Sequence, residues 1–460
     1  MGHLSRYASA EMEAVFSNEN KYLTWRKIWL SLAKNEKALG VNIPDEAILS
    51  LEQSLKDIRW DRVSYWEGVT RHEVLAHIHA WGEVAPEAKP YIHLGATSCD
   101  IMDNADLILM RQGLELLLRK LIAVNHHLCK FALKWKAKRT LGYTHFQSAQ
   151  LTTVGKRSCL WLQDLDKDFN NLYSICDNLS LRGLKGAVGT SASFQSLISN
   201  VKKLESNFAA DFDFDDCLII SGQTYSRKID YEIISTISGI GISAAKMGAD
   251  LRLLSHLGEV EEPFEKSQVG SSAMPYKRNP MRAERLCSLS RHLVNQANEA
   301  AQTAMNQWLE RSLDDSAGRR LYIPETFLTA DGILNILLNL SSGLVVNEAI
   351  IEKNVLEKLP YLLTEKLILK LVDSGMDRQT AHEKIRQVSF SSKESVSSGG
   401  EDLFSKLISE DVDLNSAWQS ILNSEGSELI GLAETQVASF VESIYIKYKT
   451  LPSFNNNLSV

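Results

Sequence analysis

The sequence predicts an all-α protein built around a bundle of long helices. Only nine prolines occur in 460 residues, and apolar residues seldom follow the alternating pattern of strands. Three stretches instead repeat apolar residues at steps of three and four, which is the spacing of one helix face. With 44% apolar and 23% charged residues, the composition is that of an ordinary globular protein. We therefore expect a long central helix bundle flanked by two smaller helical domains.

Three apolar stripes define the expected bundle. The first begins near Asp106 and runs for four heptads without a miss, which predicts one long helix. The second carries Gly239, Gly241 and Gly248 between its apolar residues, and such small side chains allow a close approach of helices. We interpret the stripes as core, and long helices of this kind often complete their burial against other subunits. The stripes are Leu107, Met110, Leu114, Leu117, Leu121, Val124, Leu128, Phe131 and Trp135; Ile233, Ile237, Ile240, Ala244, Met247, Leu251 and Leu254; and Ala330, Ile333, Leu337, Leu340 and Leu344.

The chain is expected to divide into three parts. An N-terminal helical domain covers residues 1–97 and ends in a turn-rich stretch, residues 86–98. The long-helix bundle follows over residues 98–350, and a C-terminal helical domain over 351–460, where polar residues interrupt the third stripe. Residues 451–460 are predicted to form a loose tail.

Charge and cysteine usage exclude several classes of protein. The net charge of −7 argues against nucleic acid as the main partner. No apolar run approaches the roughly 18 residues of a membrane span, and the N-terminus lacks the apolar stretch of a secretory signal, so we expect a cytoplasmic protein. The six cysteines are scattered without CxxC pairs, which favours buried reduced thiols over disulfides or zinc ligands.

A long loop at 258–282 separates two of the expected helices and is rich in glycine, serine and proline. Over residues 266–291 six basic side chains face one acidic side chain, in a chain that is acidic overall. A solvated basic face is the usual meaning of such a run. The accompanying turn, Gly270-Ser271-Ser272, could also hold an oxyanion on backbone N–H groups, so an anionic ligand is the second interpretation.

The sequence GSSAMPYKRNP at 270–280 resembles the signature loop of the fumarase/aspartase superfamily, whose members cleave C–N or C–O bonds and release fumarate. Across the chain the resemblance is to the adenylosuccinate lyase family, and most of all to its animal-type branch. It implies that the protein cleaves adenylosuccinate to AMP and fumarate, and succinylaminoimidazole carboxamide ribotide (SAICAR) to AICAR and fumarate. It also implies a homotetramer that needs no metal or organic cofactor. The matching segments are residues 5–9, 71–79, 93–98, 142–157, 221–228 and 309–320.

Eliminating an amine from a succinyl group requires two opposed proton-transfer groups and a clamp for anions. By resemblance, Ser271 is the base, acting as an alkoxide that Lys277 and loop N–H groups stabilise. Lys277 also holds the carboxylate that gains charge in the intermediate. His145 is the general acid toward the departing nitrogen, a role that suits an imidazole near neutral pH.

The segment HEVLAH at 72–77 looks like a zinc-binding helix, but the zinc motif is HExxH and the second histidine here comes one residue later. The resemblance instead places Arg71, His72 and Glu73 along the substrate, with His72 assisting near the phosphate and the departing group. Glu73 stands where aspartate is usual in the family, and Ser148 where proline is common, which loosens the expected turn after His145.

A substrate with two carboxylates and a phosphate calls for bidentate donors such as arginine. Glu284 either orients a catalytic histidine or forms a structural ion pair. The resemblance also implies that each site combines three subunits of the tetramer, which explains how residues so far apart in sequence could converge. The implied substrate-binding residues are Arg6, Tyr7, Arg71, His72, Glu73, Thr97, Ser98, Thr144, Gln223, Lys277, Asn279, Arg285, Arg311, Ser316 and Arg320.

Two other functions share parts of this pattern. Another fumarate-releasing lyase, such as argininosuccinate lyase or aspartase, would keep the Gly270-Ser271-Ser272 turn but lack a site for a nucleotide phosphate. A catalytically silent structural oligomer would be expected to lose Ser271, Lys277 or His145, and all three are present.

Overall fold

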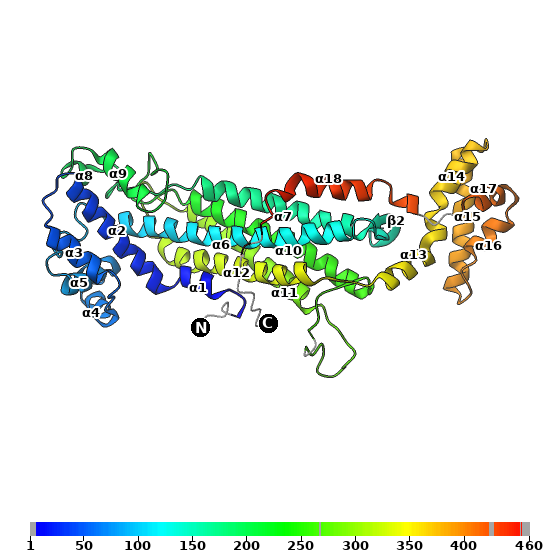
Figure 1. The fold of residues 1–460 in the computed structure, drawn as a ribbon, viewed down its shortest axis with the longest axis horizontal. Coiled ribbons are helices and arrows are strands. Elements are labelled where there is room, and N and C mark those ends of the chain that lie inside the picture. The colour runs from blue at the N-terminus through cyan, green and yellow to red at the C-terminus, as the bar shows by residue number, and fades with distance from the viewer. Residues whose placement is uncertain (1–5, 266–267, 423–426, 451, 453–460) are drawn as a thin grey trace.

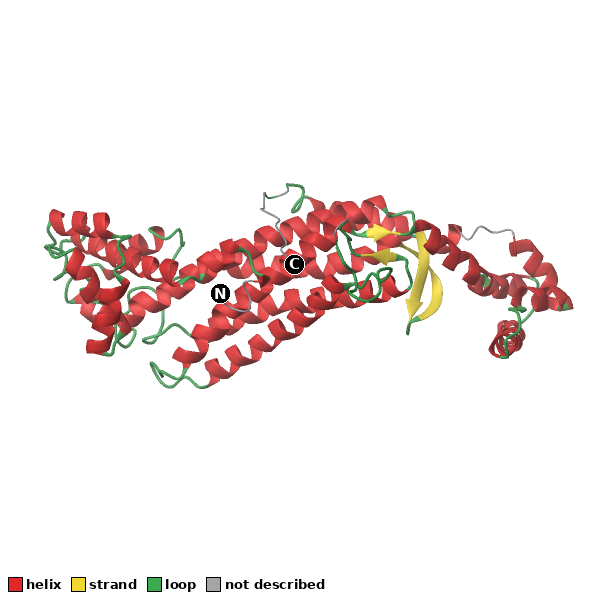
Figure 2. Cartoon of the chain, turned by 90° about the horizontal axis from the view of Figure 1, so that it is seen from below, coloured by secondary structure: helices red, strands yellow, loops and turns green. Residues whose placement is uncertain are grey.

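The computed structural model describes residues 6–265, 268–422, 427–450 and 452. These residues form an elongated array of helices, with a long central bundle and a smaller helical unit at each end (Figure 1). The all-α prediction is confirmed, since the described strands are short and gather toward one end of the bundle (Figure 2). Residues 266 and 267 of the predicted loop, and all of the predicted tail except Pro452, lie outside the described residues.

Six helices form the central bundle within the described part of the chain. α6 packs against α7 and α12, and α10 packs against α7, α11 and α12. α18 lies along α6 and α7 (Figure 1). The helices are α6 (Ser98–Lys134), α7 (Val154–Asp177), α10 (Lys228–His256), α11 (Met281–Met305), α12 (Asp315–Gly343) and α18 (Ala433–Tyr445).

The first predicted stripe is the buried face of α6. Its residues from Leu107 to Leu128 are fully buried, and Phe131 is 9% exposed. Each such side chain contributes roughly 1.5–3 kcal/mol of hydrophobic free energy. The helix begins where the Thr97 N–H donates to the Asp100 carboxylate at 2.7 Å, which satisfies one of the free N–H groups of the first turn.

The predicted glycines allow α10 to lie very close to its neighbours. A Cβ on Gly248 would come within 3.0 Å of the Ala283 carbonyl oxygen of α11. A Cβ on Gly239 would come within 2.8 Å of the Asp168 carboxylate of α7. Larger side chains at these positions would separate the helices, so the glycines fix the spacing of the bundle.

The third predicted stripe lies in α12 and is also core. Its residues from Ala330 to Leu340 are fully buried. One 18-residue window of α12 is apolar enough to cross a membrane, but 72% of that window is buried inside the protein. The apolar character of α12 is therefore explained by its place among the other helices of the bundle.

The cysteines are buried and free, as predicted. Burial raises the pKa of the Cys129 thiol to about 12, so this group stays protonated. All six are therefore small core side chains that take part in no disulfide.

The N-terminal unit packs on the first half of α6. α2 contributes Trp25, Ile28, Trp29 and Leu32, which are at most 1% exposed. Two short helices from the middle of the chain, α8 and α9, lie at the same end (Figure 1). The unit contains α1 (Ala10–Val15), α2 (Asn18–Ala38), α3 (Asp45–Ser54), α4 (Trp60–Thr70), α5 (Glu73–Val84), α8 (Ala192–Gln195) and α9 (Val201–Ala210).

The predicted C-terminal domain, residues 351–460, occupies two places in the structure. Its first part has a core of its own, which includes Leu367, Phe404 and Trp418. Its last helix, α18, returns to the bundle, where Val437 and Val441 join the main core. The first part consists of α13 (Glu348–Leu362), α14 (Thr364–Asp373), α15 (Arg378–Ser397), α16 (Phe404–Glu410), α17 (Val412–Leu422) and the short 3-10 helix η2 (Ser427–Ile430).

Two small antiparallel sheets lie toward the end of the bundle where α6 finishes, and the sequence pattern did not predict them. β1 (Arg139–Thr144) and β2 (Gln147–Thr153) form a hairpin directly after α6. β3 (Val260–Glu261) pairs with β4 (Val345–Val346), which joins the start of the predicted loop to the end of α12. We call this end of the bundle the hairpin end, and the end where α6, α10 and α12 begin the cavity end.

Candidate active site

The implied site residues do not lie together within one chain. Ser98 is the first residue of α6, and His145 lies on the hairpin that follows this helix. At 1.5 Å per residue, the 37 residues of α6 span about 55 Å. The hairpin end carries Thr144 and His145, whereas the cavity end carries a larger group. That group is Arg71, His72, Glu73, Thr97, Ser98, Gln223, Arg311, Ser316 and Arg320.

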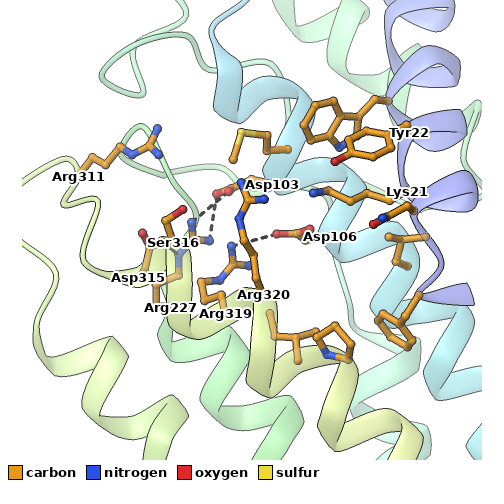
Figure 3. A pocket seen from close by; sticks show the side chains of 17 residues that line it. Lys21, Tyr22, Asp103, Asp106, Arg227, Arg311, Asp315, Ser316, Arg319 and Arg320 are labelled. Atoms are coloured by element: carbon orange, nitrogen blue, oxygen red, sulfur yellow. Dashed lines mark hydrogen bonds and ion pairs between the residues drawn. The ribbon is translucent and has the colours of Figure 1, made fainter. Parts of the chain in front are cut away.

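A cavity of about 370 Å³ lies between α2, α6 and the start of α12. Among the implied residues, Arg311, Ser316 and Arg320 line it. Figure 3 shows these residues on one side of the cavity, with Lys21 and Tyr22 of α2 on the other. The sequence reasoning did not include Lys21 or Tyr22.

The wall formed by Arg311, Ser316 and Arg320 is suited to an anion. Arg311 donates to the Gln223 side-chain oxygen at 2.7 Å and to the Cys99 sulfur at 2.7 Å, so both of these partners are neutral. Ser316 lies in the first turn of α12, whose free N–H groups and helix dipole favour a negative charge. Arg320 follows four residues later, on the same helix face. Together these groups can bind a phosphate or a carboxylate.

Beneath this wall, buried ion pairs fasten the beginnings of α6, α10 and α12 to one another. Arg227 pairs with Asp103 at 3.0 Å and with Asp315 at 2.6 Å. Arg319 pairs with Asp230 at 2.7 Å and with Asp106 at 2.9 Å. Because these carboxylates already have cationic partners, they do not neutralise the arginines that face the cavity. The signal in the sequence is a pair of acids, Asp103 and Asp106, three residues apart and directly before the apolar stripe of α6.

Burial and charge act in opposite directions on the carboxylates of this network. Burial alone would raise the pKa of Asp103, but Arg227 and Arg319 outweigh it and hold that pKa below its usual range. For Asp106 burial wins over the charge of Arg319, and the pKa is raised. The network thus keeps Asp103 ionised beneath the cavity.

His72 lies beside Ser98 at the cavity end of the bundle. It caps α5: its Nδ1 accepts from the Leu75 N–H at 3.3 Å, and its Nε2 is 3.4 Å from the Ser98 hydroxyl. Arg71, just before it, has a left-handed backbone with φ of 54° and ends α4. The second histidine of the zinc-like segment, His77, instead stacks on Tyr22 with ring centroids 4.0 Å apart. The two histidines therefore have different surroundings and different partners.

Glu73 is in contact with three cavity-lining residues. Its carboxylate accepts from the Lys21 ammonium at 3.1 Å and the Tyr22 hydroxyl at 2.7 Å, and it pairs closely with Arg320. Burial alone would raise the pKa of Glu73, but the hydrogen bond from Arg320 and the charge of Lys21 outweigh it and lower the pKa to about 2. Glu73 is therefore a carboxylate at every physiological pH.

His145 lies at the tip of the β1–β2 hairpin. Thr144 pairs with Gln147, so His145 and Phe146 form a two-residue tip, and both have positive φ, 52° and 59°. Two left-handed residues in succession suit a tight hairpin turn but are strained for side chains other than glycine. Ser148 takes its place in the ladder opposite Tyr143, so the turn is formed without the proline usual in the family. His145 is exposed.

A buried carboxylate anchors this hairpin. Glu259, which is 0% exposed, accepts from the Tyr143 hydroxyl at 3.2 Å and from Asn354 of α13 at 3.0 Å. It is also 3.8 Å from Arg157 of α7. Because Glu259 directly precedes β3, its contacts join β1, the strand that leads to His145, to the start of the loop at 258–282. No motif points to Glu259, which stands three residues after the end of α10 at His256, within the charged loop at 258–282.

The signature loop closes on itself around Ser271. The Ser271 hydroxyl accepts from the Met274 N–H at 3.2 Å, and the Asn279 side chain donates to the Gly270 carbonyl at 3.0 Å. A Cβ on Gly270 would lie 2.0 Å from the Lys277 carbonyl oxygen, so glycine is required where the two backbones meet. The Lys277 side chain is exposed.

The implied residues after the loop lie at the start of α11. Glu284 and Arg285 are in its first turns, and the Glu284 side chain is exposed. Within the described residues no hydrogen bond or ion pair joins Glu284 to a histidine of its own chain. The cap of α11 is supplied by Glu262, whose carboxylate accepts from the N–H groups of Arg282 and Ala283.

Arg6 and Tyr7 form a further separate group, beside the middle of α12. The Tyr7 carbonyl accepts from Asn335 at 2.9 Å, and a Cβ on Gly332 would lie 2.8 Å from the Tyr7 Cβ. Gly332 is twelve residues beyond Arg320 on the same helix, or about 18 Å. Arg6 and Tyr7 are therefore not part of the cavity in their own chain.

The chain is similar to known sequences over most of its length. A family model described as a lyase matches residues 20–294. The adenylosuccinate lyase of Saccharomyces cerevisiae is 46% identical over 447 residues, which cover 95% of this chain and 93% of the yeast protein. The adenylosuccinate lyase of Schistosoma mansoni is 40% identical, with 99% of this chain and 97% of that protein covered.

Solved structures share the fold at lower sequence identity. A 3-carboxy-cis,cis-muconate lactonizing enzyme from Pseudomonas putida superposes with a TM-score of 0.83 at 22% identity, over 97% of this chain and 99% of that one. A fumarate lyase from Mesorhizobium sp. BNC1 superposes with a TM-score of 0.82 at 21% identity, over 95% and 98%. These likenesses confirm the predicted fold, a long helix bundle with a helical unit at each end.

Proposed function

The chain belongs to the adenylosuccinate lyase family, and from that premise we propose that it cleaves adenylosuccinate to AMP and fumarate, and SAICAR to AICAR and fumarate. It is a carbon–nitrogen lyase of the fumarase/aspartase superfamily. The observation that carries the substrate assignment is the anion-binding wall of Arg311, Ser316 and Arg320. Such a wall can bind a nucleotide phosphate, whereas a catalytically silent structural oligomer would not need an anion-binding wall.

The proposed reaction is a β-elimination that uses side chains alone. Ser271, as an alkoxide, takes the proton from the succinyl carbon next to a carboxylate. The electrons of that C–H bond form the new C=C bond, and the C–N bond breaks. His145 gives a proton to the departing nitrogen, so the products are fumarate and the nucleotide amine. The Lys277 ammonium stabilises the carboxylate that gains negative charge on the way. Metal and organic cofactors have no part in this scheme.

The separation of the groups supports active sites shared between subunits. The anion-binding wall and the His145 hairpin lie at opposite ends of a helix of about 55 Å. A single substrate cannot contact both in one chain. We infer a homotetramer in which one subunit supplies the cavity end, a second the hairpin with His145, and a third the signature loop with Ser271. The exposed positions of His145 and Lys277 fit this arrangement.

The deciding experiment measures fumarate release from two substrates. The purified protein is incubated separately with adenylosuccinate and argininosuccinate, and fumarate is followed together with the ultraviolet change of the purine. Release from adenylosuccinate alone supports the proposal. Release from argininosuccinate alone would keep the elimination chemistry but overturn the nucleotide substrate, and release from neither would overturn the enzyme. A cytoplasmic location is part of the proposal and is tested by cell fractionation.

A further inference from the structure

Glu73 forms an ionic junction between α5, α2 and α12, and the residues around it extend beyond those of the proposed reaction. Its carboxylate is 16% exposed and pairs with Arg320 of α12. The same carboxylate accepts from Lys21 and Tyr22 of α2. One acid of α5 is therefore shared by two cations and a hydroxyl that lie on two other helices.

In this arrangement Glu73 forms an ion pair with Arg320, the arginine that is placed to bind the substrate. Arg320 is four residues beyond Ser316 and lines the same cavity. Both of its terminal nitrogens contact the Glu73 carboxylate, Nη1 at 3.4 Å and Nη2 more closely. A phosphate presents the same pair of acceptor oxygens to a guanidinium. When a nucleotide binds, its phosphate therefore competes with the Glu73 carboxylate for Arg320.

Lys21 and Tyr22 are placed to hold Glu73 after this exchange. The Lys21 ammonium and the Tyr22 hydroxyl lie 3.1 and 2.7 Å from the same Glu73 oxygen, on the side of α2. The Tyr22 ring is fixed by stacking on His77 and by an edge contact with Trp25 at 5.0 Å. With both partners in place, Glu73 keeps a cation and a hydrogen bond when Arg320 leaves. Without them a largely buried carboxylate would lose its partners, which is unfavourable.

We propose that, without substrate, the Glu73 carboxylate binds Arg320 in place of the substrate phosphate. When the phosphate binds Arg320, Lys21 and Tyr22 act as positioning residues that hold the Glu73 carboxylate. This inference rests on the proposed function, because it concerns the phosphate of that substrate. Nucleotide affinity then depends on Lys21 although Lys21 does not touch the nucleotide.

The test measures nucleotide binding in a cycle of variants. The Lys21→Met variant keeps the length of the side chain and loses its charge. We expect it to weaken AMP binding, followed by calorimetry, about tenfold, because Glu73 then retains Arg320. The binding of adenosine, which lacks the phosphate, should stay within about twofold of wild type. Turnover of adenylosuccinate should show the loss in KM, with kcat nearly unchanged.

The second arm of the cycle asks whether Lys21 acts through Glu73. In a Glu73→Gln background there is no carboxylate to hold, so Lys21→Met should change AMP affinity less than about twofold. An equal loss in both backgrounds would show that Lys21 binds the phosphate directly and would overturn the inference. Unchanged AMP affinity in Lys21→Met would overturn it as well, because a purely structural lysine lowers the melting temperature without this coupling.

Two further variants keep the test decisive. Tyr22→Phe removes only the hydroxyl that Glu73 accepts from, and it should weaken AMP binding in the same direction. Lys34→Met, on the same helix, removes a half-exposed ion pair with Glu52 and should leave AMP affinity unchanged. Wild-type protein that releases no fumarate from adenylosuccinate would refute the proposed function. Active wild type with no effect of Lys21→Met would refute only this inference.

Discussion

Ser98 and His145 are separated by the whole length of α6, although both belong to segments of the proposed active site. The first residue of the helix contacts His72 at the cavity end, and the hairpin at the other end presents His145 to the outside of the chain. The ends of the helix are about 55 Å apart, so under the proposed reaction, in which one substrate contacts both ends, the two groups come from different subunits.

Complementation between inactive variants tests this directly. If Ser271 and His145 of one site come from different subunits, mixed tetramers of Ser271→Ala and His145→Ala chains will contain some sites that have both groups. Fumarate release should reappear when the two inactive proteins are mixed under conditions of subunit exchange. Absence of recovery, with exchange verified by labelled subunits, would mean that each chain builds its own site.

Replacement of Ser271 by alanine should abolish turnover and preserve binding. The variant lacks the proposed base, and we expect kcat to fall by at least about a thousandfold. Affinity for AMP should stay near that of wild type, since Ser271 has no part in the wall that binds the phosphate. A near-normal rate in a correctly assembled variant would remove Ser271 from the role of base.

Removal of the proposed acid should act on kcat. In the His145→Ala variant, the departing nitrogen has no proton donor, so kcat should fall about 10²- to 10⁴-fold. His382→Ala, an exposed histidine of α15, is the matched control and should retain wild-type rates. A change confined to KM would contradict the role of His145 as the acid.

The buried network beneath the cavity should be essential for stability. Arg227→Met leaves the Asp103 and Asp315 carboxylates without this cation in the interior, and loss of one partner of a buried pair costs about 3–5 kcal/mol. We expect a large fall in the melting temperature at fixed protein concentration. Lys34→Met, which breaks the half-exposed pair with Glu52, should cost less than about 1 kcal/mol. Equal melting temperatures for the two variants would contradict this reasoning.

Glu36 of α2 predicts a pH dependence of stability. It is 0% exposed, neither carboxylate oxygen has a hydrogen-bond partner among the described residues, and burial raises its pKa to about 8. Between the usual pKa of 4.5 and about 8, the folded chain holds a proton that the unfolded chain releases. Stability therefore falls as the pH rises through this window, by about 3 kcal/mol per chain at pH 7.

Glu36→Gln removes this titration. The variant should melt near the wild-type temperature at pH 5 and above it at pH 8. Glu46→Gln, at an exposed position of α3, should follow the wild-type curve at both pH values. A gain for Glu36→Gln that is the same at pH 5 and pH 8 would show that the carboxyl does not titrate in this range.

The sequence pattern predicted the long helices well because each one buries a single regular stripe. The burial of the stripe from Leu107 to Leu128 could be predicted without knowing which helices pack on it, because a repeat of three and four residues already defines the inner face. The β1–β2 hairpin was missed because its residues follow the end of a helix and carry no clear alternation. Its tip is held by two strained left-handed residues rather than by the glycines that usually reveal such a turn.

The candidate site was predictable in identity but not in arrangement. Motif resemblance named Glu73 and Arg320, yet nothing in the sequence showed that the two are paired, or that Lys21 and Tyr22 join them. Such contacts depend on where α2, α5 and α12 meet, and they join residues up to 247 positions apart. Likewise, the role of Glu259 is seen only in the structure, where residues of β1, α7 and α13 contact its carboxylate.

Residues 348–422 and 427–430 form a unit between the bundle and α18, which packs on the bundle again. The unit begins and ends beside the β1–β2 hairpin. α13 departs beside β1 and β2, and η2 comes back against β2. The segment between them has its own core, built around Leu367 and Trp418. The core around Leu367 and Trp418 is therefore separate from the main core of the bundle. A side chain shortened at Trp418 leaves its cavity inside this unit and not between the bundle helices.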